Sequence, residues 1–201
     1  MATLGHQRSG PTARIWSARL VAERPADERA LVLAAQKGER EAFSELVRTH
    51  ERRAYAVARA IVLNHEDAED AVQEAFLHAY RALHRFLPDQ AFGAWLHRIV
   101  ANAALDITRR RKVRDADELP ETIASPFKDP AESSELRRRL KDALETLPPR
   151  QRAVIVLHDV EGYKHAEIGV TLGIPEGTAR SDLHYARSHL REVLGSVRSE
   201  L

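Results

Sequence analysis

Apolar residues recur at helical spacing through most of this chain. Between Glu66 and Phe86 they follow one another every third or fourth residue, which is the period of a helix with one buried face. They are Ala68, Ala71, Val72, Ala75, Phe76, Ala79, Tyr80 and Leu83. We expect this stretch to be the clearest helix of the protein, with its remaining positions facing outward.

The same period appears on both sides of that helix. The apolar positions before it are Phe43, Leu46, Val47, Val57, Ala58 and Ile61, and those after it are Phe92, Trp95, Leu96, Ile99 and Ala103. A short helix is expected near Arg29 to Gln36. Together these segments predict a helical bundle over residues 27–114, with Trp95 on its apolar stripe as a core residue.

The bundle is followed by a segment of different composition. Residues 115–132 contain several prolines, have no apolar period and are strongly acidic, which is typical of a flexible linker. Helical patterning returns over residues 133–198. Its β-branched run Val154-Ile155-Val156 is compatible with a strand, but the chain offers no partner strand, so we expect a helix. The prediction is an all-α protein of two small helical domains, preceded by a flexible extension over residues 1–26.

A helix-turn-helix is predicted within the second domain. Ala166 to Leu172 is expected to form a short helix, Gly173 to adopt the positive φ of a tight turn, and Ile174 to begin the next element. Pro175 is tolerated in the first turn of a helix, where its missing N–H has no partner. Gly177 lies in the same turn, where the lack of a side chain allows another backbone to approach.

The second helix of this motif has two distinct faces. Its inward positions are Ala179, Leu183, Ala186 and Leu190, and its outward positions are Arg180, Ser181, His184, Tyr185 and Arg187. Outward arginine, serine and histidine side chains reach base edges in a major groove, and the N-terminus of a helix suits a phosphate. The spacing alone is equally compatible with an ordinary solvated face.

Charge is distributed unevenly although the net charge is only +1. Five basic residues lie together at Arg109, Arg110, Arg111, Lys112 and Arg114, whereas residues 115–135 hold seven acidic residues and one lysine. The basic cluster favours phosphate binding or the C-terminus of a helix. The chain has no cysteine, which excludes disulfides and thiolate zinc sites and suits the cytoplasm. No apolar run is long enough to span a bilayer.

An enzyme reading depends on the densest group of possible metal ligands. They are His65, Glu66, Asp67, Glu69 and Asp70, which is a set that a helical metal-dependent phosphohydrolase would use. Successive residues of a helix point in different directions, so these side chains cannot converge on one ion without another segment. Neither an HExxH motif nor a phosphate-binding glycine loop occurs, so we predict no enzymatic activity and no cofactor.

The motifs of the two domains together resemble those of one family. The segment LPPRQRAVIVLHDVEGYKHAEIGVTLGIPEGTARSDLHYAR is similar to region 4 of the extracytoplasmic-function (ECF) sigma factors of bacterial RNA polymerase. The segments HEDAEDAVQEAFLHAYRAL and AFGAWLHRIVANAALDITRRR are similar to region 2. Both sets occur in the expected order over about residues 28 to 195.

The resemblance implies a role for each exposed face. Core polymerase would be bound through the β′ clamp helices by Asp70, Gln73, Glu74 and Leu77. The −10 promoter element would be bound by Phe86, His97, Arg98, Asn102, Arg109 and Arg110, with Phe86 and Asn102 forming a pocket for a flipped base. The −35 element would be bound by Thr178, Arg180, Ser181, His184, Tyr185 and Arg187. Further implied partners are the β flap of the polymerase and an anti-sigma factor.

Two departures from the family pattern bear on promoter recognition. Family members commonly carry Ser-Tyr where this chain has Lys164-His165, and basic residues where it has Asp182 and Tyr185. An acid at position 182 would repel a phosphate or prefer the amino group of a cytosine. The sequence thus predicts an ECF-type sigma factor, with a stand-alone helix-turn-helix regulator as the alternative.

Overall fold

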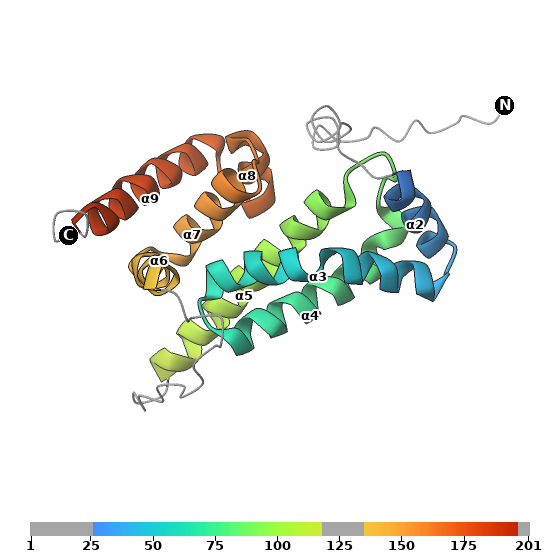
Figure 1. Cartoon of the computed structure of the whole chain (residues 1–201), viewed down its shortest axis with the longest axis horizontal. Helices are drawn as coiled ribbons and strands as arrows, with labels where there is room; N and C mark the ends of the chain where they lie inside the picture. Colours follow the sequence, from blue (N-terminus) through green and yellow to red (C-terminus); the bar gives the residue numbers. More distant parts are fainter. Residues whose placement is uncertain (1–25, 118–134, 197–201) are drawn as a thin grey trace.

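The computed structural model describes residues 26–117 and 135–196, and within these ranges every regular element is helical (Figure 1). In chain order the elements are α2 (Ala26–Gln36), α3 (Arg40–Val62), α4 (His65–Ala82), the 3₁₀ turn η2 (Leu83–Arg85), α5 (Phe92–Asp117), α6 (Glu135–Glu145), α7 (Pro149–Ile155), the π-helical turn η4 (Val156–Val160), α8 (His165–Leu172) and α9 (Glu176–Ser196). The all-α prediction is confirmed. The predicted extension and most of the predicted linker lie outside the described residues.

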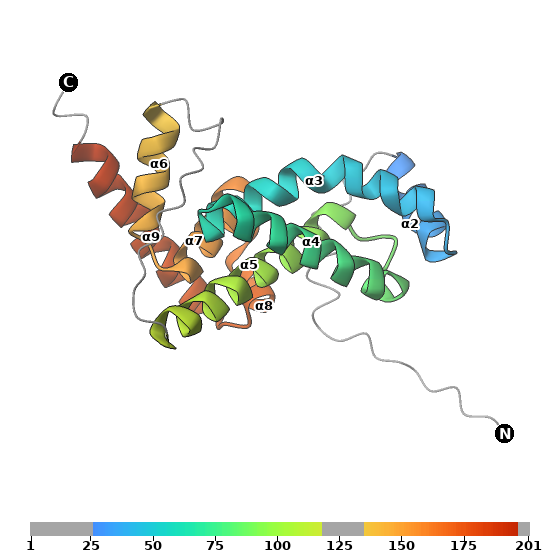
Figure 2. The same ribbon diagram turned by 90° about the horizontal axis from the view of Figure 1, so that it is seen from below.

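The first group of helices is built around α3, α4 and α5. These three run side by side, and α2 packs against the N-terminal part of α3 (Figures 1 and 2). Leu46, Ile61, Phe92 and Leu96 are fully buried between them. The predicted apolar stripes therefore form the core, with Tyr80 as an exception because it is about half exposed.

Local interactions explain where these helices begin and end. The side-chain oxygen of Asn64 accepts a hydrogen bond from the backbone N–H of Asp67 at 2.7 Å, which caps the N-terminus of α4. Leu63 adopts φ 69° immediately before it, and its N–H donates to the carbonyl of Arg59 at 2.9 Å to end α3. At the other end of α4, the amide of Gln36 donates to the carbonyls of Leu83 and Phe86 and ties α2 to η2.

The second group consists of α6 to α9 with η4. The run Val154-Ile155-Val156 is helical as predicted, but the backbone changes from α to π geometry at Val156. Gly173 has φ 66°, and the N–H of Ile174 donates to the carbonyl of Gly169 at 2.9 Å to close the turn between α8 and α9. Within the described ranges, no helix combines the length and apolar character needed to cross a bilayer.

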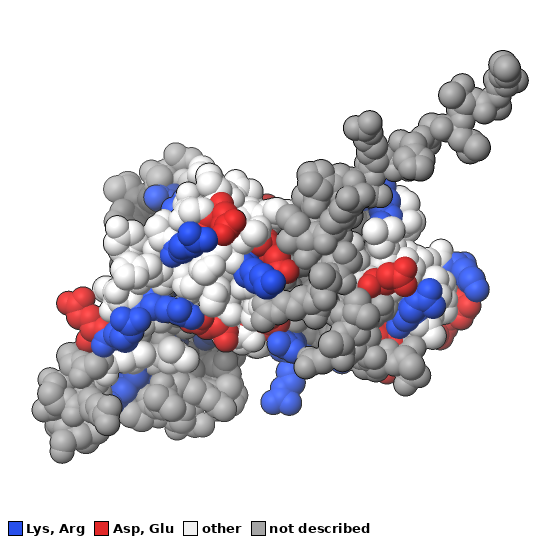
Figure 3. Space-filling view, turned by 90° about the horizontal axis from the view of Figure 1, so that it is seen from above, with Lys and Arg blue, Asp and Glu red and all other residues white. Residues whose placement is uncertain are grey.

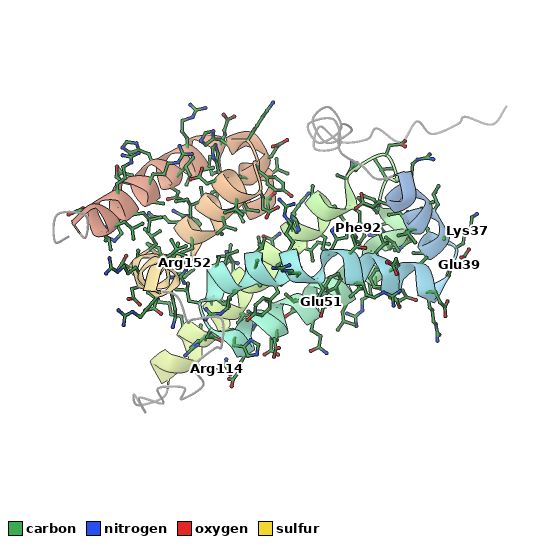
Figure 4. All side chains as sticks on the ribbon, viewed as in Figure 1. Lys37, Glu39, Glu51, Phe92, Arg114 and Arg152 are labelled. Carbon is green, nitrogen blue, oxygen red and sulfur yellow. The ribbon has the colours of Figure 1, made fainter. Side chains whose placement is uncertain are left out.

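The two groups pack against each other through α7, η4 and α8 on one side and α3 and α5 on the other. Arg152 of α7, labelled in Figure 4, is buried at this contact. Its guanidinium donates to the carbonyl of Ile61 at 2.7 Å and to that of Leu147 at 2.8 Å. A buried charge is tolerated when its donors are satisfied, so Arg152 links the end of α3 to the α6–α7 connection.

Candidate nucleic-acid interface

Helix α9 presents a continuous polar face. Arg180, Ser181, His184 and Tyr185 are exposed, with Tyr185 at 62%, while Ala179, Leu183 and Ala186 are buried against α7 and α8. This division confirms the inward and outward positions expected from the spacing. Thr178 is half-buried in the first turn, where its carbonyl accepts a hydrogen bond from the hydroxyl of Ser181 at 3.0 Å. The exposed residues Arg180, Ser181, His184 and Tyr185 are called the reading face below.

The turn before α9 differs in detail from the prediction. Helix α9 begins at Glu176, so Pro175 precedes the first turn, and its carbonyl accepts from the N–H groups of Thr178 and Ala179. A Cβ added at Gly177 would meet no atom within 4 Å, so the expected backbone approach there is wrong. The close approach occurs at Gly169 instead, where an added Cβ would lie 2.8 Å from the carbonyl oxygen of Ile174.

Asp182 does not belong to the reading face. Its carboxylate is 7% exposed and accepts two hydrogen bonds from Arg150 of α7, at 2.7 Å from Nε and 3.3 Å from Nη2. The hydrogen bond and charge of Asp182 outweigh desolvation and raise the pKa of Arg150. Because the carboxylate is turned inward and occupied, neither repulsion of a phosphate nor a contact with a cytosine follows from this conformation.

Arg187 is held by a second ion pair at the other edge of the reading face. Its Nε donates to Oδ2 of Asp159 in η4 at 3.0 Å, and its Nη2 donates to Oδ1. This pairing raises the pKa of Arg187 and lowers that of Asp159, which also lies beside His158. The π-helical turn thus supplies the acid that orients Arg187 of α9.

The polar face of α4 is partly paired with α5. Asp70, Gln73 and Leu77 are exposed, whereas Glu74 accepts a hydrogen bond from Nη2 of Arg110 at 2.8 Å. A groove between the two helices is lined by these residues of α4 and by Arg109, Arg110 and Arg114 of α5. The predicted polymerase face and the predicted phosphate cluster are therefore neighbours, and part of their charge is mutually neutralised.

The residues expected to contact the −10 element differ in accessibility. Arg98 and Asn102 are half-buried, and Arg109 is exposed and pairs with Asp106 at 2.8 Å. Phe86 is 5% exposed and stacks on Trp95, whose ring centroid lies 4.7 Å away. Trp95 packs against the core as predicted. Phe86 is thus part of the same aromatic cluster as Trp95 and does not reach the surface beside Asn102.

His97 is also buried, but its partner comes from the second group of helices. Its Nδ1 lies 2.8 Å from Oε2 of Glu161, and both side chains are at most 5% exposed. Arg53 of α3 pairs with the same carboxylate at 3.0 Å. Nearby, the hydroxyl of Tyr163 donates to the carbonyl of Ala94 at 2.6 Å, and burial raises the pKa of that hydroxyl. In this conformation the segment 161–163 covers the start of α5.

Basic and acidic side chains lie close together on the face seen in Figure 3. There, small blue and red groups lie next to each other, and uncharged surface lies between these groups. The possible metal ligands near the start of α4 are also engaged locally, since His65 pairs with Glu69 at 3.3 Å and Asp67 with Arg111 at 3.1 Å. The polar helix faces described above are suited to binding macromolecules. The exposed residues of α9 are of the kinds that bind nucleic acid.

Comparison with known proteins gives consistent matches. Residues 46–114 match the family model of Sigma-70 region 2, and residues 137–190 match that of Sigma-70, region 4. The chain is 39% identical over 165 residues to the ECF RNA polymerase sigma factor SigM of Mycobacterium tuberculosis, covering 82% of this chain and 83% of SigM. It is 42% identical over 164 residues to SigE of Mycolicibacterium smegmatis, covering 79% of this chain and 63% of SigE.

A solved structure agrees with these matches. The sigma factor RpoE from Bartonella quintana, in complex with the anti-sigma factor NepR, superposes with a TM-score of 0.62 at 26% identity, over 76% of this chain and 96% of that chain. A region 2 bundle followed by a region 4 helix-turn-helix defines an RNA polymerase sigma factor. Within that class, the chain belongs to the ECF sigma factors.

Three residues at these contacts were missed by the sequence analysis. Arg150 and Arg152 stood in the basic start of a helix, and Glu161 stood in a Glu-Gly turn, where no local pattern distinguished them. Arg150 pairs with Asp182, and Glu161 pairs with His97. Both partners are far away in the sequence. Only the opposite charges at positions 150 and 182, in adjacent helices of one small domain, carried a signal of pairing.

Proposed function

We propose that this sigma factor binds core RNA polymerase and recognises promoter DNA through two helical domains, residues 27–114 and 133–198, without catalysing a reaction. The observation that carries the proposal is the exposed reading face of α9, in a chain whose bundle also leaves a polar face of α4 uncovered. One face suits DNA and the other suits a protein, and the order of the two sigma regions supports using them together.

The face of α4 is proposed as the polymerase-docking surface. Asp70, Gln73 and Leu77 are exposed, Leu77 at 51%, so two polar groups and an apolar side chain follow one another on one side of the helix. Basic groups of the β′ clamp helices would pair with the acids, and Leu77 would be buried. Glu74 joins this surface by exchanging its pairing with Arg110 for a group on the polymerase. The β flap is the proposed partner of region 4.

Promoter contacts are proposed on both domains. On α9, Thr178, Arg180, Ser181, His184, Tyr185 and Arg187 would approach the −35 element in the major groove. On α5, Arg98 and Asn102 would contact the −10 element, and Arg109 and Arg110 its phosphates. His97 becomes available only when Glu161 leaves it, and Phe86 supports this region from beneath.

An inhibitory protein partner and a cytoplasmic location complete the proposal. The relative from Bartonella quintana is in complex with an anti-sigma factor. A partner of this kind is proposed here as well, because a protein that covers α4 or the reading face would prevent both proposed contacts. Polymerase and promoter DNA are in the cytoplasm, and the protein is expected to act there.

The test is retention of purified core RNA polymerase by the immobilised full chain. A variant with Asp70, Gln73 and Glu74 changed to Ala is expected to lose about 5- to 150-fold in affinity, because charged contacts of a docking surface contribute on the order of 1–3 kcal/mol together. The control changes Glu39, which precedes α3, and Glu41, in its first turn, to Ala, so that two exposed negative charges are also removed there. No retention by the wild-type chain would contradict the proposal.

A further inference from the structure

The ion pair between Arg150 and Asp182 leaves part of the arginine available. The side chain of Arg150 is 52% exposed, whereas that of Asp182 is 7% exposed. Nε and Nη2 donate to the carboxylate, and the described residues give Nη1 no hydrogen-bond partner. A guanidinium presents its donors in a rigid plane, so fixing two of its nitrogens also fixes the direction of the third.

The position of this guanidinium is set by α9. Asp182 lies one turn after Thr178 and almost one turn before Tyr185, so these three residues share one side of the helix. Asp182 points inward to α7, and Tyr185 points to solvent. Arg150 therefore stands at the edge of the reading face on the Thr178–Tyr185 side.

The opposite edge carries a similar pair. Arg187 lies one turn after His184 on the other side of α9, and Asp159 of η4 holds its guanidinium. The reading face is thus flanked by two arginines, each held by an aspartate from a different element. A helix in a major groove has a phosphate backbone on each side, so arginines at both edges match the spacing of its negative charge.

We infer that Arg150 is a DNA-backbone contact of region 4, and that Asp182 is a positioning residue for it and does not read a base. The inference rests on the proposed role of α9 in DNA binding. The family pattern carries a basic residue at position 182, and in this chain the positive charge of that site is supplied from α7. Asp182 reduces the rotamer freedom of Arg150 before DNA arrives, so less entropy is lost on binding.

The alternative is an ion pair that only stabilises the domain, and salt-dependent DNA binding separates the two. The probe is a fluorescent 30-bp DNA duplex of random sequence, titrated with the full chain at several salt concentrations. A phosphate contact contributes about 0.9 to the slope of log affinity against log salt. The reading face is exposed in the described conformation, so the duplex needs no rearrangement of the chain to reach it.

The expected result for Arg150→Gln is a slope smaller by about 0.9 and an affinity lower by about tenfold at 50 mM salt. The matched control is Arg48→Gln, since Arg48 is also exposed and paired with a carboxylate, that of Glu45 on α3. It is expected to leave the slope unchanged. Thermal unfolding of each variant establishes that it is folded. A folded Arg150→Gln protein with the wild-type slope would overturn the inference, as would absence of wild-type binding at low salt.

Two further variants separate positioning from base reading and from stability. Arg150→Lys retains the charge and loses the two-point contact with Asp182, so the slope is expected to stay within about 0.3 of wild type while the melting temperature falls. Asp182→Asn is expected to keep the base preference obtained by selection from randomised duplexes. A changed preference at one base pair would show that Asp182 reads a base.

Failure of this inference is distinguishable from failure of the proposed function. The duplex measurement contains no polymerase, and the polymerase measurement contains no DNA. Retention of core polymerase with an unchanged slope for Arg150→Gln would reject the DNA contact alone. A reduced slope without retention of polymerase would reject the sigma-factor role and leave Arg150 as a DNA contact of a stand-alone regulator.

Discussion

At the scale of single residues, Asn102 gives the sharpest test of −10 recognition. It is half-buried on α5, between His97 and the exposed arginines that begin at Arg109. Its amide is proposed to hydrogen-bond a base that has left the duplex stack, so Asn102→Ala is expected to weaken open-complex formation by about 1–3 kcal/mol. Core binding should be unchanged, because the proposed docking surface is on α4.

The measurement is run-off transcription and permanganate footprinting by reconstituted holoenzyme, on a promoter mapped from transcripts of the wild-type enzyme. Retention of core polymerase by the same variant is the control. An equal loss in both assays would show that Asn102 acts through the fold of region 2, and wild-type opening would exclude it from the base pocket.

The direction of a side chain was predictable only where it depends on the apolar pattern of its own helix. Arg180 and His184 point outward because Ala179 and Leu183 fill the core side of the same helix. Asp182 stands between these positions, and its direction depends on Arg150 in another helix. The burial of His97 likewise depends on Glu161, far away in the chain. Sequence spacing contains no information on such pairs, since they form only when helices pack.

At the scale of elements, the turn between α8 and α9 allows a test with two opposite outcomes. A Cβ at Gly169 would meet the backbone oxygen of Ile174 at 2.8 Å, and a backbone atom cannot move without shifting the turn. Gly169→Ala is therefore expected to destabilise the protein by about 1–3 kcal/mol. Gly177→Ala meets nothing within 4 Å in the first turn of α9 and is expected to stabilise by about 0.4–1 kcal/mol.

Urea unfolding of both variants followed by circular dichroism measures this difference in the free energy of unfolding. Gly169→Ala should also weaken duplex binding, because it changes the angle between α8 and the reading face. A stable Gly169→Ala variant would mean that the turn relaxes freely, and a destabilised Gly177→Ala variant would show that the first turn of α9 requires glycine.

The helices themselves were largely predictable, whereas their closest contacts were not. Periodic apolar residues such as Ala68 and Val72 determine which face of α4 is buried, so the element follows from the sequence. The backbone approach expected at Gly177 occurs at Gly169, where helix packing brings the carbonyl oxygen of Ile174 close. The change to π geometry at Val156 was not predictable either. The β-branched residues around it are equally compatible with a strand and carry no pattern typical of a π-helix.

At the scale of the whole molecule, Glu161 connects the two sigma regions. Its carboxylate is 3% exposed and faces His97 of α5 and Arg53 of α3, with the hydroxyl of Tyr163 near it. Burial raises the pKa of Glu161, but the hydrogen bond and charge of His97 and those of Arg53 lower it by more, so the net pKa lies below its ordinary value. This contact was not predicted, because the apolar period identifies the buried face of each helix but not which helices of different domains meet.

This lowered pKa predicts how the contact depends on pH. A carboxylate whose pKa is lower in the folded state stabilises that state above its unfolded-state value of about 4.5, and the stabilisation is lost as the pH falls through the folded-state pKa. Glu161→Gln keeps the shape and removes the charge. It is expected to cost about 1–3 kcal/mol at neutral pH, since a buried charged contact becomes a neutral one.

The free energy of unfolding of wild type and Glu161→Gln, measured in urea at intervals from pH 7 to pH 3, checks this expectation. The difference between the two proteins should shrink below about pH 4.5, because protonated wild type then resembles the variant. Glu51→Gln is the control, as Glu51 is exposed on α3. A difference independent of pH would show that packing around Glu161, and not its charge, holds the two sigma regions together and keeps His97 covered.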